Sequence, residues 1–261
     1  MDRSYPIQAK LERANKHLAE LRTAVKELLD SAFVFETKMD YDKQEYGYYV
    51  LSVEDCPSDQ TAIIGDVLHS LRSALDYLAW QLVDSAGSRP TQNTSFPIFD
   101  DPSKYAAQSP GKLKGMRPDA VAAIDALKPY KEGNNLLWQL HKLNIIDKHR
   151  MLITAASAMD MHSLTPSMRT KLLTIYAGSY PNEPLPDLRG VMTPAHTLKF
   201  PLKAGDLLLT TPQSEVEARM HFHFDVMFNE PSTVVGKSVS GTLMEFADCV
   251  AKVVSSFTPF L

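Results

Sequence analysis

Two apolar segments near the middle of the chain, residues 68–80 and 137–150, carry His, Asp and Arg at helical spacings. Both have the apolar content of helices that lie in a protein core. Ionisable groups in a core must be paired or hydrogen-bonded, because burying an isolated charge is costly. The polar cluster on these helices is therefore either a network that fixes how they pack or a functional site.

The first segment belongs to a helix with two distinct faces. At about 100° per residue, one face is aliphatic and consists of Ile64, Val67, Leu71, Leu75, Leu78 and Leu82. The opposite face holds His69, Arg72, Ser73, Asp76 and Trp80. A stripe that faces solvent does not need a tryptophan, so we expect this second face to be covered as well.

The second segment is the expected partner. One face of its helix holds Leu137, His141, Asn144, Lys148 and Leu152. Asp147 precedes Arg150 by three residues, a spacing that permits an ion pair. We expect the polar face of the first helix to lie against the face with His141 and Asn144.

The side-chain chemistry of this cluster suggests roles for its members. Histidine transfers protons near neutral pH, and arginine holds a phosphate or carboxylate with two N–H donors. The candidate catalytic residues are His69, Arg72, Asp76, His141 and His149. The candidate binding residues are Tyr77, Trp80, Asn144, Asp147 and Arg150. A buried network that fixes helix register, or simple surface ion pairs, would explain the same residues.

The composition of the chain limits its possible binding partners and its location in the cell. The net charge of −4 gives no overall attraction to nucleic acid or to an anionic membrane, so RNA or a small anionic ligand would need a local site. Lys112, Lys114 and Arg117 lie close together, but the pattern is typical of a solvated loop. The two cysteines are too few for a disulfide framework, which favours a reducing cytoplasm. No apolar run approaches membrane-spanning length.

Common cofactor and metal motifs are missing. Residues 236–238 read Gly-Lys-Ser, like the end of a phosphate-binding loop, but Pro231 stands where that motif requires glycine. His221 and His223 alternate on one strand face without an identifiable third ligand. We therefore expect neither a metal site nor a bound cofactor.

The pattern predicts an α+β fold. Residues 6–30 form a helix with a heptad-like stripe, which docks on other helices or, as a less favoured alternative, pairs two copies in a homodimer. The following elements are a β-hairpin over 32–38 and 46–53, a helix from 58 to about 87, a long loop over 88–116, a short helix from Pro118 to before Pro129, and a helix over 135–159.

The second part of the chain reads differently. The expected strands cover residues 171–176, 197–200, 206–210 and 218–228, and they form an antiparallel β-region. A final helix, with apolar residues from Val239 to Phe257, packs back on the bundle. We expect a helical bundle domain over residues 1–160 and a β-rich region with the last helix over 161–261, packed as one unit.

These helices also resemble known proteins. Residues 65–80, the Phe-Pro-Ile-Phe of 96–99, the Lys-Pro-Tyr of 128–130 and residues 137–150 are similar to a widespread family of uncharacterised bacterial proteins. The similarity covers most of residues 5–155 and implies no established activity.

A more distant resemblance is to HEPN domains, helical bundles often found in RNA-cleaving toxins. Their motif is Arg, four to six residues, then His; here Arg72 and four residues lead to Tyr77 instead. The resemblance implies metal-independent RNA cleavage, in which Arg72 holds a phosphate and His69, His141 or His149 moves protons, or else an inactive relative. The alternative is a non-enzymatic module that binds an anionic ligand or a partner protein in the same pocket. Tyr77 and the negative net charge favour this alternative.

Overall fold

The computed structural model describes residues 3–31, 33–53, 58–149, 154–161, 174, 203–212, 222–230 and 233–261. The chain divides into two compact units, each drawn from several stretches. The first consists of Met1–Ala24, Pro57–Thr154 and Phe228–Leu261, and the second of Val25–Cys56 and Ala155–Met227. Helices and strands together give the α+β class that the sequence predicts.

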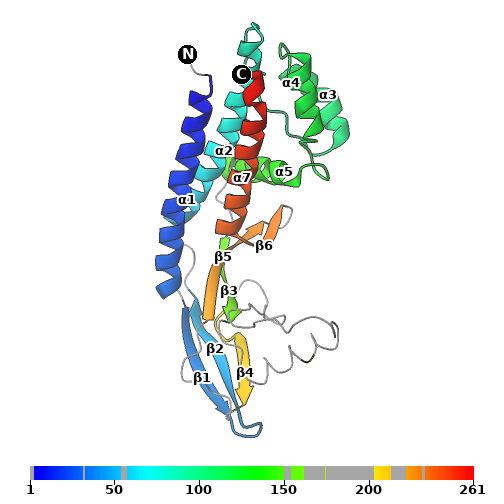
Figure 1. Ribbon diagram of the computed structural model, residues 1–261. Helices are drawn as coiled ribbons and strands as arrows, with labels where there is room; N and C mark the ends of the chain where they lie inside the picture. Colours follow the sequence, from blue (N-terminus) through cyan, green and yellow to red (C-terminus); the bar gives the residue numbers. More distant parts are fainter. Residues whose placement is uncertain are drawn as a thin grey trace. The chain divides into compact units, whose positions relative to one another are not determined.

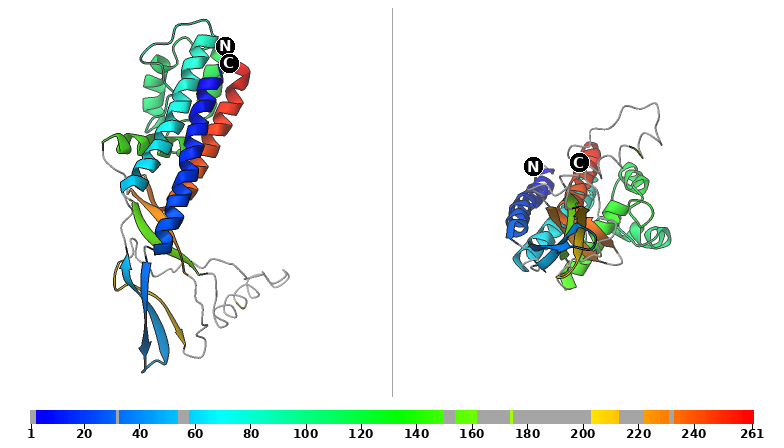
Figure 2. Two further views of the ribbon diagram at one scale, coloured as in Figure 1. Left: turned by 90° about the vertical axis from the view of Figure 1, so that its left-hand side faces the viewer. Right: turned by 90° about the horizontal axis from the view of Figure 1, so that it is seen from below.

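The first unit is built from helices. They are α1 (Tyr5–Ser31, of which the part up to Ala24 belongs here), α2 (Ser58–Ser85), α3 (Pro102–Lys112), α4 (Pro118–Ala126), α5 (Asn135–His149) and α7 (Val239–Phe257). The first part of α1 runs beside α2 and α7, and α5 lies across α2 and α7 (Figures 1 and 2). None of the described helices combines the length and the apolar character needed to cross a membrane.

The core forms where the predicted stripes meet. The aliphatic face expected on α2 is buried along its whole length. The same holds for the stripe on α7, whose buried residues include Val239, Leu243, Phe246, Val250, Val253 and Phe257. Most of the predicted stripe on α1 is also buried, which confirms that it docks within the chain. Burying these side chains supplies the main stabilising free energy of such a bundle.

The segment predicted as a loop over residues 88–116 contains a helix, α3. Asp101 caps this helix by accepting a hydrogen bond from the amide of Lys104 at 2.8 Å, and Pro102 occupies its first turn. The hydroxyl of Tyr105 donates to Asp125 at 2.6 Å and so joins α3 to α4. Few apolar residues in α3 are buried, so hydrophobic periodicity did not reveal the helix.

The helix predicted over 135–159 ends ten residues early. It stops at His149, and Thr154–Met161 forms strand β3. In the sheet of order β3-β5-β6, β5 is Phe222–Glu230 and β6 is Val234–Ser238. Strand pairing gives the backbone of β3 a hydrogen-bonded ladder, which outweighs the helix propensity of its alanines. Strand β6 was not predicted, and it includes the Gly-Lys-Ser sequence.

The second unit contains the predicted hairpin. Strands β1 (Phe33–Asp40) and β2 (Glu45–Val53) pair antiparallel, and β4 (Leu207–Pro212) pairs antiparallel with β2. Of the strands predicted over 206–210 and 218–228, β4 confirms residues 207–210 and β5 confirms residues 222–228. Of residues 171–176, only Thr174 is described, and its backbone is helical rather than extended. Residues 197–200 lie outside the described residues, as do Arg150 and His221.

Candidate functional site

Arg72 lies near the middle of α2 and is buried, with 7% of its surface exposed. Its Nη2 donates a hydrogen bond to the carbonyl oxygen of Phe96 at 2.8 Å. Asp76, one helical turn further on, places Oδ1 2.9 Å from the same Nη2 and accepts a hydrogen bond from the amide of Phe96 at 3.0 Å. Both main-chain polar groups of Phe96 are therefore bound by α2, while its ring is fully buried.

The other terminal nitrogen of Arg72 is not satisfied in this way. No described residue accepts a hydrogen bond from Nη1 of Arg72, although this atom is shielded from solvent. Burial lowers the pKa of Arg72 and the charge of Asp76 raises it again, but a guanidinium keeps its proton in proteins. A buried charged donor without an acceptor is costly, so it either lowers stability or serves a ligand.

Arg72 lines a cavity of about 450 Å³ in the first unit. Its walls come from α2, from the segment that follows Phe96, from α3 and from α5. The lining residues are Arg72, Phe96, Ile98, Phe99, Asp100, Lys104, Gln108, Lys112, His141, Lys142 and Ile145. Four of these side chains are cationic and one is a carboxylate, so the cavity has a positive surplus.

The single carboxylate in this wall, Asp100, is fully engaged. It accepts hydrogen bonds from Lys142 at 2.6 Å, from Nε1 of Trp138 at 3.2 Å and from Lys104 at 3.4 Å. The hydrogen bond from Lys142 is the main cause that lowers the pKa of Asp100 to about 2. Asp100 is therefore ionised at neutral pH and balances part of the charge of the two lysines.

Lys112 lies at the end of α3 and is one of the four cations that line the cavity. Its ammonium donates to the hydroxyl of Ser95 at 2.8 Å and lies 6.0 Å from the ring centroid of Phe99. Burial lowers the pKa of Lys112, and the nearby charge of Arg72 lowers it further. The two cations thus repel each other, and an anion between them would relieve that repulsion.

His141 projects from α5 into the wall of the same cavity and is largely buried. No described residue forms a hydrogen bond with its Nδ1. Burial first, and then the charges of Arg72 and Lys142, lower the pKa of His141 to about 3, against a smaller opposite effect of Asp100. The ring is therefore neutral at pH 7, and its tautomer decides whether Nδ1 donates or accepts a hydrogen bond.

The sequence predicted one cluster where the structure has two. His69 is exposed, with Nε2 3.4 Å from the hydroxyl of Ser73, and it does not line the Arg72 cavity. With Asn144 and Asp147 it borders a separate cavity of about 360 Å³. Burial raises the pKa of Asp147, as does the charge of Asp66. The expected contact between α2 and α5 is present, but it brings only Arg72 into the same cavity wall as His141, whereas His69 lies at the other cavity.

The polar face of α2 is covered only in part, contrary to the expectation based on Trp80. Trp80 is 44% exposed and Tyr77 is 42% exposed, with the ammonium of Lys10 5.6 Å from the centroid of the Tyr77 ring. His149 is exposed at the end of α5. The proposed partner of Asp147, Arg150, lies outside the described residues, so their ion pair stays a prediction.

Several lining residues were missed as site residues. Lys112 was noted only as part of a basic stretch, and its neighbours Lys114 and Arg117 are indeed exposed. Asp100, Lys104 and Lys142 gave no signal, because single charges on helix and loop surfaces are common. The Phe-Pro-Ile-Phe anchor was the one available sign, since its burial brings Asp100 and α3 to the cavity.

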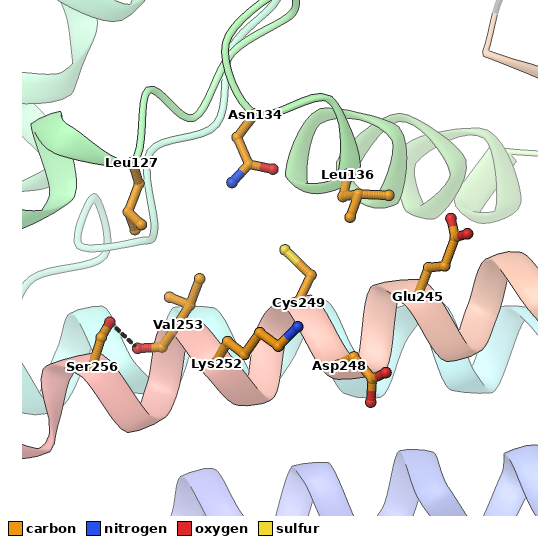
Figure 3. Close-up of a pocket in the computed structure, with 9 residues that line it drawn as sticks. All are labelled: Leu127, Asn134, Leu136, Glu245, Asp248, Cys249, Lys252, Val253 and Ser256. Carbon is orange, nitrogen blue, oxygen red and sulfur yellow. Dashed lines mark hydrogen bonds between the residues drawn. The ribbon is translucent and has the colours of Figure 1, made fainter.

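A second large cavity of about 470 Å³ lies between α5, α7 and the loop before α5 (Figure 3). Its walls include Asn134, Glu245, Asp248, Cys249 and Lys252. Burial raises the pKa of the Cys249 thiol, which makes it a weak nucleophile. The buried nitrogen and oxygen atoms without a described partner are found only in Arg72 and His141 among the described side chains, so the Arg72 cavity is the better candidate.

Among the described residues, no group of three or more His, Cys, Asp or Glu side chains is arranged to hold a metal ion. Comparisons with protein-family models, with curated proteins and with solved structures give no match for this chain. Function is therefore inferred from the chemistry of the Arg72 cavity.

Proposed function

We propose that the protein is a binding module that holds the anionic group of a small ligand against Arg72. The observation that supports this proposal is the state of the guanidinium. It is buried at the wall of a cavity of small-molecule size, and its Nη1 has no hydrogen-bond acceptor among the described residues. An anion in the cavity would supply that acceptor.

The electrostatic surroundings support the same function. Removing an ion from water costs several kcal/mol unless an opposite charge compensates it. Asp76 compensates Arg72 only partly, because its side chain is 37% exposed and also binds the Phe96 amide. Lys112 and Lys142 add positive charge to the same wall. Charge-assisted hydrogen bonds from such groups are about twice as strong as neutral ones.

Calorimetric titration of the full chain tests this function. The probes are inorganic phosphate, sulfate and benzoate, at low ionic strength. We expect at least one of them to bind, and we expect Lys112→Gln to weaken that binding by about tenfold, the equivalent of one lost charge-assisted contact. Lys114→Gln is the matched control, since Lys114 is exposed and does not line the cavity. Absence of binding by every probe, or equal losses in both variants, would refute the proposal.

Metal-independent cleavage of RNA is a second candidate, and one observation favours it. A neutral histidine, His141, lines the same cavity as the arginine. In this mechanism His141 accepts the proton of the attacking hydroxyl and Arg72 stabilises the charge on the phosphate. The pKa of about 3 makes His141 a weak base, which ranks this function below the binding module.

A further inference from the structure

We infer that the group bound at Arg72 is a terminal phosphate, as in a small phosphate monoester with an apolar or aromatic body. The inference rests on the proposed function and adds the class of ligand. It draws on three features of the cavity: how the donors are distributed, how much charge they carry, and what lines the remaining wall.

The donors around the cavity come from different elements. Arg72 belongs to α2, Lys112 to the end of α3, and His141 with Lys142 to α5. Nη2 of Arg72 is already bound to Phe96 and Asp76, so the planar fork of Nη1 and Nη2 that pairs end-on with a carboxylate is not available. Donors from separate helices suit the three terminal oxygens of a tetrahedral phosphate better than the two coplanar oxygens of a carboxylate.

The charge of the site also favours a dianion. Four cations, Arg72, Lys104, Lys112 and Lys142, line the cavity with one carboxylate, Asp100. Two further carboxylates lie outside the lining, Asp76 beside Arg72 and Asp101 at 3.7 Å from Lys104, and they balance these two cations in part. A phosphate monoester carries about −1.5 to −2 at pH 7 and offers three terminal oxygens to these cations. A carboxylate, or the phosphodiester of a nucleic acid, carries a single negative charge and offers only two such oxygens, so it can form fewer charge-assisted hydrogen bonds with them.

The rest of the wall indicates the body of the ligand. Ile98, Phe99 and Ile145 line the same cavity, and a volume of about 450 Å³ exceeds what a phosphate group fills. Apolar walls with a few placed charges are typical of sites for small organic ligands. A compact molecule that carries one terminal phosphate and one apolar ring fits both parts of the wall.

Three probes with one structural difference each test the inference by calorimetry at pH 7.5. They are phenyl phosphate, benzoate and methyl phenyl phosphate, which present a dianionic monoester, a carboxylate on the same ring and a monoanionic diester on the same ring. We expect phenyl phosphate to bind at least about tenfold more tightly than either of the others, as one additional charge contact gives. In Lys112→Gln this preference should fall at least threefold, whereas Lys114→Gln should retain it.

The outcomes separate this inference from the proposed function. Benzoate that binds as tightly as phenyl phosphate, with sensitivity to Lys112→Gln, would overturn the phosphate assignment and leave an anion-binding module. Methyl phenyl phosphate as the best probe would also overturn it, in favour of a phosphodiester. Failure of all three probes, with inorganic phosphate and sulfate inactive too, would remove the proposed function itself.

Discussion

The guanidinium of Arg72 donates a hydrogen bond across 2.8 Å to the carbonyl oxygen of Phe96, a residue 24 positions further along the chain. Through this bond, α2 fixes the segment that forms one wall of the cavity. Nη1 of the same arginine is buried and has no hydrogen-bond acceptor among the described residues. Arg72 is therefore a structural residue as well as the principal candidate for ligand binding, and variants that test binding must be chosen at its neighbours.

The structural role of Arg72 can be measured directly. Arg72→Met removes a charged donor and leaves the buried carbonyl of Phe96 without its partner, which should lower the free energy of unfolding by about 1.5–3 kcal/mol. Arg117→Met is the control, because Arg117 pairs with Asp119 on the surface and such pairs contribute about 0–1 kcal/mol. Urea midpoints of the three proteins give the comparison. Equal losses in the two variants would contradict the structural role.

His141 should make stability depend on pH. Below pH 6.5 the unfolded chain protonates this histidine, whereas the folded protein does so only near pH 3. The folded state therefore binds fewer protons in this window, and its stability falls as pH decreases, by at most about 1.4 kcal/mol per pH unit. The stability conferred by the neutral ring is fully present above pH 6.5.

The comparison with His141→Gln isolates this effect. Urea unfolding at pH 7.5 and at pH 5 should show a smaller loss of stability on acidification in the variant than in the wild type. Asp100 does not interfere, since its pKa of about 2 confines its own contribution to pH values below about 4. Parallel losses in both proteins would mean that burial and the surrounding cations do not hold His141 neutral.

The parts of the fold that the sequence revealed are those with regular periodicity. The stripes on α2 and α7 have apolar residues at helical spacing, and their faces are buried as expected. Burial on the polar side of α2 was harder to predict, because it depends on which other segments of the chain pack against that side. Phe96 and α3 cover Arg72, whereas Trp80 and Tyr77 stay exposed. The local sequence of α2 does not predict that a segment 20 or more residues away will pack against it.

The site itself shows the same limit. Arg72 and His141 were predicted to meet, because both break the apolar pattern of a core helix. The lysines that give the cavity its charge lie on α3 and α5, where they look like ordinary surface residues. Strand β3 was missed for a related reason, since its alanine-rich sequence favours a helix and only pairing in a sheet decides otherwise.

Close packing of α2 on α5 gives a prediction at Gly65. A Cβ atom at this position would overlap the carboxylate of Asp147, whereas a Cβ at Gly111 in α3 would meet no atom within 4 Å. Gly111→Ala should therefore stabilise the protein by about 0.5–1 kcal/mol, through the lower entropy of the unfolded chain. Gly65→Ala should lack this gain, because the Asp147 side chain must move.

A double-mutant cycle tests the assignment to Asp147. In an Asp147→Ala background, Gly65→Ala should recover the gain seen at Gly111, which corresponds to an interaction energy of at least about 0.5 kcal/mol. Thermal or urea unfolding of the four proteins provides the values. Identical effects of Gly65→Ala with and without the Asp147 carboxylate would show that a methyl group at position 65 does not meet this carboxylate in solution.

The second candidate function makes a prediction that turns on His141 rather than on Tyr77. Tyr77→His would complete the spacing of Arg, four residues and His, but residue 77 is exposed and does not line the cavity, so this change should leave any cleavage of RNA unaltered. His141→Gln should reduce cleavage by about 100-fold or more, as loss of a general base does. Mixed RNA incubated with chelator and resolved on gels is the assay. Cleavage that the chelator abolishes would show that the chemistry depends on a metal. If no folded variant cleaves RNA, the binding module remains the better of the two proposals.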